Sequence, residues 1–391
     1  MRIERCLKLL SLLLLLIATT VVVLGAFTRL ADAGLGCPDW PTCYGHLWVP
    51  DSDHEIAKAN TLFSDTPVET DKTWPEQIHR IFASNLGLLI LIAFCIVNFS
   101  RAKQYGKKQL NSVSMLLALL VVGTVSRIAF GSIVEVPLAL VVTAYFGNLI
   151  LLARNQQKPE RNAPFILISI LSGLVILQGL FGMWTVTWKL WPQVVTAHLL
   201  GGFATLSLIS LFVKYCWCGA QLDFNVTRKI KILAYVVLAL VIIQIALGGW
   251  MSSNYAALAC PDFPMCQNSL LPAMDFTSGF NFFQHVGPNY LYGKLDNHAR
   301  TAIHYSHRMG ALIVSIGVLL LSFALISLKN RLASRFAFTL LAILLAQVTL
   351  GISNIVFGLP IEVAVLHNAG GAALLICVII ILHSMKTNGV R

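Results

Sequence analysis

The sequence has few charged residues. Only 12% of its 391 residues are Asp, Glu, Lys or Arg, whereas a soluble globular chain carries about 25%. This shortage excludes a soluble protein, a disordered chain and a nucleic-acid binder of the ordinary type. Hydrophobic residues make up 57% of the chain, and apolar runs of about twenty residues recur along it, each long enough to cross a hydrocarbon core of about 30 Å. The sequence therefore predicts an all-α, polytopic membrane protein.

The apolar runs predict about ten spans. The first begins close to the N-terminus, and its apolar run is too long for a signal peptide, so we interpret it as a span. The predicted spans are 9–29, 79–99, 112–132, 136–153, 163–186, 193–213, 231–251, 302–326, 336–356 and 361–383.

The basic residues gather on one side of these spans. Of the 28 Lys and Arg residues, 19 lie in the segments on the side of the N-terminus, and 14 of the 17 acidic residues lie on the opposite side. By the positive-inside rule, both termini are cytoplasmic and the protein is integral to the cell (inner) membrane. The net charge of +11 thus reflects topology, so we expect membrane lipid around the protein and no nucleic-acid partner.

Two long loops on the predicted outer side, 31–75 and 252–300, carry the same short motif. It reads Cys-Pro-Asp-Trp-Pro-Thr-Cys at 37–43 and Cys-Pro-Asp-Phe-Pro-Met-Cys at 260–266. A repeat at corresponding places indicates an internal duplication, which is common in polytopic membrane proteins.

The duplication extends into the spans. A His-Arg pair follows each loop, and a second set of residues recurs with equal Gln-to-Gly and Gly-to-His intervals: Gln178, Gly182, Pro192 and His198 match Gln347, Gly351, Pro360 and His367. The first half is longer by about one helical hairpin. We therefore predict two pseudo-symmetric four-helix bundles plus an inserted hairpin: 1–101 with 162–215, then 102–161 as the insert, then 216–391.

Four histidines lie at similar depth near the outer ends of the predicted spans: His79, His198, His307 and His367. Ionisable groups inside a span are costly, so they indicate function. Single histidines of this kind commonly bond neighbouring helices, and His304 with His307 has a zinc-like spacing. The chain lacks an HExxH motif, however, and imidazole is a good iron ligand. We predict two haem sites, each ligated by two histidines, pairing His79 with His198 and His307 with His367.

Two further features distinguish or accompany these sites. Arg80 and Arg308 each follow a histidine, and they are candidates to pair with haem propionates or with lipid head groups.

Glu76 lies one helical turn before His79, whereas His304 occupies the equivalent place before His307. A carboxylate at only one site favours an enzyme that reacts at the first haem, with Glu76 as its catalytic group; the alternative is a merely solvated carboxylate.

The outer-side cysteines can form two small disulfide loops. Cys37 with Cys43 and Cys260 with Cys266 face the oxidising side of the membrane. Each bridge would either hold a loop over its haem site or carry electrons, and the pattern favours a structural role.

Together these motifs resemble the haem A synthase family of integral membrane proteins. The resemblance rests on GCPDWPTC at 36–43, EQIHR at 76–80, GMWTV at 182–186 and HYSHR at 304–308, and it covers nearly the whole chain except 102–160. The family has eight spans in two four-helix halves, so the ten spans predicted here depart from it.

The resemblance implies a function. Members oxidise the ring D methyl group of haem O to a formyl group, giving haem A for cytochrome oxidase. Carried over, His79 and His198 would ligate the substrate haem, His307 and His367 would ligate a haem b cofactor, and Glu76 would be catalytic. Expected partners are haem O, haem O synthase, cytochrome oxidase assembly factors and an electron carrier that the sequence does not identify.

Two other functions fit some of these features. A b-type membrane cytochrome could carry electrons between quinol and a periplasmic acceptor, and it would need no carboxylate at Glu76. A haem or metabolite transporter would explain the duplication alone. Analysis of the bound haems and their products separates these hypotheses.

Overall fold

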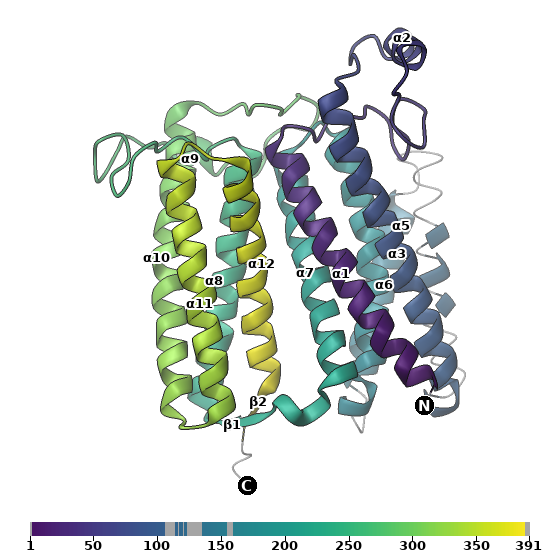
Figure 1. The fold of residues 1–391 in the computed structure, drawn as a ribbon, viewed down its shortest axis with the longest axis vertical. Helices are drawn as coiled ribbons and strands as arrows, with labels where there is room; N and C mark the ends of the chain where they lie inside the picture. The colour runs from purple at the N-terminus through teal and green to yellow at the C-terminus, as the bar shows by residue number, and fades with distance from the viewer. Residues whose placement is uncertain are drawn as a thin grey trace. The chain divides into compact units, whose positions relative to one another are not determined.

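The computed structural model describes residues 2–105, 114–115, 117–119, 121–122, 135–154 and 159–387 (Figure 1). Helices dominate this part of the chain. The long ones are α1 (Arg2–Leu30), α3 (Thr70–Tyr105), α5 (Glu135–Arg154), α6 (Pro159–Thr187), α7 (Pro192–Trp217), α8 (Arg228–Ser253), α10 (Asn297–Ser327), α11 (Arg331–Val356) and α12 (Ile361–Ser384). The short elements are α2 (Asp53–Leu62), α9 (Phe276–Gly279), the 3-10 helix η2 (Gly219–Leu222) and the strands β1 (Phe224–Val226) and β2 (Met385–Thr387).

Eight of these helices are long and apolar enough to cross a membrane: α1, α3, α6, α7, α8, α10, α11 and α12. They correspond to eight of the ten predicted spans, so the prediction of an all-α polytopic membrane protein is confirmed. The predicted span at 136–153 falls on α5, of which Val141–Ile150 is apolar. The predicted span at 112–132 lies mostly outside the described residues. The count of ten therefore stays a prediction.

The chain divides into two compact units. One comprises 1–21, 81–180 and 204–219, and the other comprises 22–80, 181–203 and 220–391. The second unit contains both disulfide loops and all four predicted haem ligands. The predicted division into two halves and an insert was drawn from the sequence duplication, so its boundaries differ from those of the two compact units. It stays a prediction.

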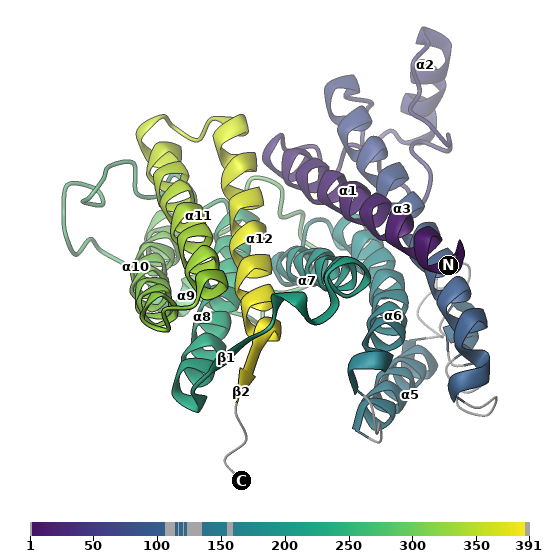
Figure 2. The same cartoon turned by 60° about the horizontal axis from the view of Figure 1, so that its bottom comes forward.

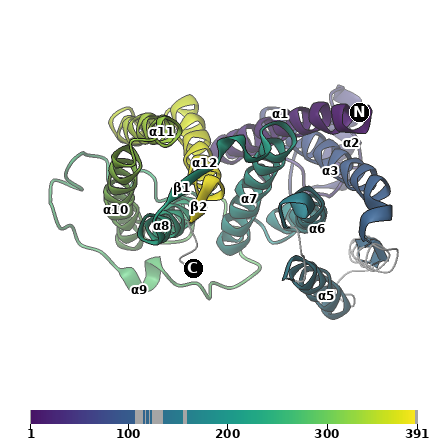
Figure 3. The same cartoon turned by 90° about the horizontal axis from the view of Figure 1, so that it is seen from below.

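The last four long helices of the second unit form a bundle. Helix α10 packs against α8 and α11, and α12 packs against α11 and α8, so the four close a ring that is seen end-on in Figure 3. Polar caps begin three of them: the side chains of Thr227, Asp296 and Asn330 accept hydrogen bonds from backbone N–H groups of the first turns of α8, α10 and α11. A four-helix bundle is a common frame for side chains that hold a cofactor.

A short parallel strand pair links the first and last helices of this bundle at one of its ends. Strand β1 precedes α8 and pairs with β2, which follows α12, in a register that places Phe224 opposite Met385 (Figure 2). The Nζ of Lys231 donates to the carbonyl of Met385 over 3.3 Å. The first and last helices of the bundle are therefore tied together at this end.

In the first unit, α5 packs against α6 through Tyr145. This side chain is fully buried, and its hydroxyl donates to the carbonyl of Ser169 over 2.6 Å. Gly173 lies against the ring, because a Cβ there would collide with it. Residues 141–145 read VVTAY where residues 194–198 of α7 read VVTAH, so Tyr145 stands in the place of His198, and in the structure it packs α5 against α6.

Candidate functional site

The two disulfide loops have the same internal hydrogen bonds. Cys37 is bonded to Cys43 and Cys260 to Cys266, as predicted. In each loop an aspartate accepts the backbone N–H groups of the two residues that follow the bridge. Asp39 accepts those of Tyr44 (2.6 Å) and Gly45 (2.9 Å), and Asp262 accepts those of Gln267 (2.6 Å) and Asn268 (2.8 Å). The duplication seen in sequence thus extends to individual hydrogen bonds.

These hydrogen bonds affect acidity in the second loop. The N–H of Asn268, supported by that of Gln267, lowers the pKa of Asp262 because both favour its charged form. In the first loop, burial raises the pKa of Tyr44 to about 12, and the nearby carboxylates of Glu69, Glu76 and Asp39 act in the same direction.

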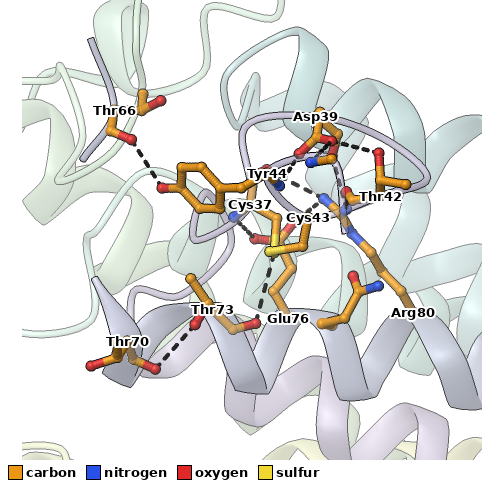
Figure 4. The surroundings of a disulfide bond; sticks show 12 residues. Cys37, Asp39, Thr42, Cys43, Tyr44, Thr66, Thr70, Thr73, Glu76 and Arg80 are labelled. Atoms are coloured by element: carbon orange, nitrogen blue, oxygen red, sulfur yellow. Dashed lines mark hydrogen bonds and ion pairs between the residues drawn. A yellow bond between two sulfur atoms is a disulfide. The ribbon is translucent and has the colours of Figure 1, made fainter. Parts of the chain in front are cut away.

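Each loop is fastened by the arginine that follows a histidine. In Figure 4, Arg80 reaches the first loop, donating from Nη1 to the carbonyls of Asp39 (2.9 Å) and Thr42 (2.8 Å) and from Nη2 to the carbonyl of Cys37 (3.4 Å). Arg80 lies ten residues along α3, so it draws the loop about 15 Å down the helix from its first residue.

Arg308 holds the second loop in the same way. It donates to the carbonyls of Met265 (2.7 Å), Cys260 (2.9 Å) and Asp262 (2.8 Å). The structure therefore gives both guanidinium groups a loop-holding role, and the pairing of Arg80 and Arg308 with haem propionates stays a prediction.

Glu76 is the buried carboxylate beneath the first loop. Its side chain is only 5% exposed. Its Oε2 accepts the backbone N–H of Cys37 over 2.9 Å, and its Oε1 accepts from Nη2 of Arg80 over 2.5 Å (Figure 4). Hydrogen bonds that involve an ionised group are roughly twice as strong as neutral ones. The carboxylate is thus held in one orientation, one turn from His79, and each oxygen keeps further capacity to accept.

His304 occupies the matching place beneath the second loop. It is buried, and its Nδ1 lies 3.1 Å from the carbonyl oxygen of Ala256 and 3.4 Å from the backbone nitrogen of Cys260. The difference between a carboxylate and an imidazole at equivalent positions, inferred from sequence, is thus present in three dimensions. His304 bonds the loop, so its spacing from His307 serves loop attachment in this structure.

Each of the four predicted ligands lies against a glycine of the preceding long helix. A Cβ placed on that glycine would approach the imidazole Cε1 to between 2.8 and 3.7 Å: Gly25 to His79 (2.8 Å), Gly182 to His198 (3.7 Å), Gly248 to His307 (3.1 Å) and Gly351 to His367 (3.1 Å). The internal repeat matched Gly182 with Gly351 and missed Gly25 and Gly248. Gly248 had a usable signal, since it follows Gln244 by the same four residues.

The imidazoles of each predicted pair are close enough to interact electrostatically, and their joint ligation of an iron stays a prediction. His198 lies within the range of electrostatic interaction with His79, and His307 lies within that range of His367. The Nδ1 of His198 is buried, with no hydrogen-bond partner among the described residues.

These residues fit an iron porphyrin better than zinc. A protein zinc site needs three or four ligands from the chain, and no group of three or more His, Cys, Asp or Glu side chains suited to a metal occurs in the part of the chain that the structure describes. A porphyrin supplies four nitrogen ligands itself, so two imidazoles complete the coordination of its iron. The glycine beside each imidazole keeps that edge of the ring clear of a side chain.

Comparisons with known proteins identify the family. The cytochrome oxidase assembly protein family COX15-CtaA matches residues 8–134 and 125–379 of this chain. The chain belongs to this family. A curated haem A synthase of Shewanella oneidensis is 38% identical to it over 362 residues, which cover 92% of this chain and 91% of that protein.

More distant members of the family carry the same name. Haem A synthases of Rickettsia bellii and Nitrosospira multiformis are 23% and 24% identical to this chain, and they cover 95% and 94% of it. The matches therefore extend over both disulfide loops and both histidine pairs, so the duplicated site lies within the region shared with these family members.

Proposed function

We propose that this protein oxidises the ring D methyl group of haem O to a formyl group and so produces haem A. The relatives named haem A synthase support the reaction. The observation that carries the proposal is the difference between the two histidine pairs, since the buried carboxylate of Glu76 lies beside one and the imidazole of His304 beside the other. A symmetric electron carrier has no need of this difference.

Under this proposal His79 and His198 ligate the substrate haem, while His307 and His367 ligate a haem b cofactor. The bound cofactor would supply an iron that accepts and passes on single electrons. Turning a methyl group into a formyl group removes four electrons from that carbon and adds one oxygen atom. With water as the oxygen donor the balance is R–CH3 + H2O → R–CHO + 4 H+ + 4 e−, so the electrons must pass to the electron carrier and the reacting site needs a proton acceptor. Glu76 is the carboxylate available for this, one turn from His79 on the same helical face.

The surrounding residues orient Glu76. The Arg80 guanidinium and the Cys37 N–H each donate to one of its two oxygens. Cys37 belongs to the first disulfide loop, and Arg80 on α3 donates to carbonyls of the same loop. The disulfide, Asp39 and Arg80 therefore act together as a rigid cover that limits the rotation of the carboxylate. Preorganised groups of this kind are effective because they need not reorganise during the reaction.

The proposal also places the protein in the cell (inner) membrane with both termini in the cytoplasm, because the basic residues lie on that side. The disulfide loops then lie on the outer side, where their bridges are stable. The proposed partners are haem O synthase, which would supply haem O, cytochrome oxidase assembly factors, which would receive haem A, and an electron carrier.

The test is product analysis in a host that makes haem O and has no haem A synthase of its own. Haems extracted from the purified protein are separated and their masses measured. We expect haem A from the unchanged protein, and a fall in its formation of at least about a hundredfold in Glu76→Gln, which keeps the shape and loses the basic carboxylate. His304→Gln is the matched control and should still form haem A.

Unconverted haem O in folded, haem-loaded protein would refute the proposal and leave the electron-carrying cytochrome as the better interpretation. Equal haem A formation by Glu76→Gln and His304→Gln would remove the assigned role of Glu76.

A further inference from the structure

The outer ends of α1 and α8 meet at residues that the internal repeat makes equivalent. The two disulfide motifs are 223 residues apart, and the same interval relates Arg29 to Ser252 and Asp32 to Tyr255. Arg29 donates from Nη2 to the carbonyl of Ser252 over 2.5 Å, and the hydroxyl of Tyr255 donates to Oδ1 of Asp32 over 2.8 Å. Equivalent residues of two repeats touch each other only beside the axis that relates the repeats. We call these four residues the joint.

Tyr255 is the central residue of the joint. Nη1 of Arg29 donates to its hydroxyl over 2.9 Å, and the guanidinium carbon lies 4.2 Å from the centroid of its ring. The hydroxyl therefore accepts from a cation and donates to a carboxylate at once, and hydrogen bonds that involve an ionised group are the strong ones. Burial raises the pKa of Tyr255, so the hydroxyl keeps its proton at neutral pH.

One side of the joint leads to Glu76. In the same outer turn of α1, the buried hydroxyl of Thr28 donates to the carbonyl of Pro75, which directly precedes Glu76, over 3.1 Å. One turn further along α1 toward the membrane, Gly25 lies against the imidazole of His79. The outer end of α1 thus contacts α3 both directly before Glu76 and at His79.

The other side of the joint leads to His304. Ala256 follows Tyr255 and is fully buried, and its carbonyl oxygen lies 3.1 Å from Nδ1 of His304. The N–H of Ala256 donates to the carbonyl of Met251 over 2.9 Å, which holds this residue against the end of α8. The joint therefore lies one residue away from contacts to both places at which the two histidine sites differ.

We propose that Tyr255 is a positioning residue of the first histidine pair: its hydroxyl fixes the outer turn of α1, and that turn fixes Glu76 and His79. This inference rests on the proposed function, which makes Glu76 and His79 part of the reacting site. It gives the C-terminal repeat a residue that acts on the chemistry of the first repeat.

The physical reason lies in the close contact between α1 and His79. A Cβ added to Gly25 would stand only 2.8 Å from Cε1 of the imidazole, so a shift of this part of α1 is passed on to the ring. The Tyr255 hydroxyl restrains that shift, because it bonds Arg29 at the end of α1 to a residue that follows α8. Misplacement by about 1 Å at a reacting centre can cost about a hundredfold in rate.

The test is electron paramagnetic resonance of the purified, haem-loaded full-length protein, together with its rate of haem A formation. The low-spin ferric signal of the first pair is the one lost in His79→Ala. Tyr255→Phe should shift this signal and slow haem A formation by about fivefold, which corresponds to the loss of one net hydrogen bond. Tyr290→Phe is the matched control, because its hydroxyl donates to the carbonyl of His285 within the same outer loop. It should leave the signal and the rate unchanged.

A double-mutant cycle tests whether the effect passes through α1. Residues that act through one hydrogen-bond network are not additive, so adding Tyr255→Phe to Arg29→Leu should shift the signal no further than Arg29→Leu alone. Fully additive shifts would overturn the inference. An unchanged signal in Tyr255→Phe would also overturn it, even with a lowered thermal midpoint, because the joint would then only hold the repeats together. The signal is read from bound haem whether or not haem O is converted, so this inference and the proposed function fail separately.

Discussion

Gly25→Ala tests whether the glycine beside His79 determines where this imidazole lies. A Cβ at Gly25 would stand 2.8 Å from Cε1 of His79, whereas two carbon atoms in contact prefer about 3.5–4.0 Å. The ring must therefore retreat by about 1 Å, or the two helices must separate. A misplacement of about 1 Å at a reacting centre can cost about a hundredfold in rate, and overpacking of this kind costs about 1–3 kcal/mol in stability.

Gly182→Ala is the matched control in the same half of the site. Its Cβ would stand 3.7 Å from Cε1 of His198, which is ordinary contact. We expect Gly25→Ala to lose most haem A formation and to alter the absorption spectrum of the bound haem, while Gly182→Ala stays within about twofold of the unchanged protein. The assay is haem extraction and mass analysis at equal protein amounts. Equal spectra and equal product from the two alanine variants would refute the reasoning, because only one of them creates a collision.

Three further predictions concern the loops. Removing the Cys37–Cys43 bridge with Cys43→Ser should lower the free energy of unfolding by about 2 kcal/mol, because the unfolded chain gains the entropy of an open loop. The thermal midpoint should fall; an unchanged midpoint would show that the loop is held without the bridge. Arg308→Lys should weaken three hydrogen bonds to the second loop by about 2 kcal/mol in total and speed proteolysis within 260–266, and cleavage at the original rate would contradict this role. Burial raises the pKa of Tyr44 to about 12, so its contribution to stability is complete below pH 10 and is lost as the pH rises toward 12. Ultraviolet difference titration against Tyr44→Phe should show one tyrosine ionising near pH 12, and a difference centred at pH 10 would disprove the burial argument.

The candidate haem ligands and the bridges could both be predicted from sequence because their chemistry is visible residue by residue; the structure contains the bridges, and the ligation stays a prediction. A histidine inside an apolar span is costly wherever it points, so His79 and its three counterparts are conspicuous in the amino-acid sequence alone. The two CPDxPxC motifs likewise specified the disulfides, since both cysteines of each pair lie in one short loop.

The roles of neighbouring residues were harder to predict, because they depend on how separate segments pack. Arg80 and Arg308 looked like groups for propionates or lipid, and only the path of the loops shows that their hydrogen bonds go to loop carbonyls. Gly25 and Gly248 carry no chemistry of their own, and glycine is common in membrane helices. The four-residue interval from Gln244 could have pointed to Gly248, but the role of Gly25 is visible only once the imidazole of His79 is placed against it.

The strand pair that closes the C-terminal bundle has a mechanical consequence. Strand β2 follows α12 near the end of the chain and lies parallel to β1, which precedes α8. If the chain were pulled apart across this pair, the force would act along the two strands in opposite directions. The hydrogen bonds at the three paired positions would then be sheared and would have to break together. Deleting Met385–Thr387 would remove this lock and allow α12 to detach by peeling from its free end.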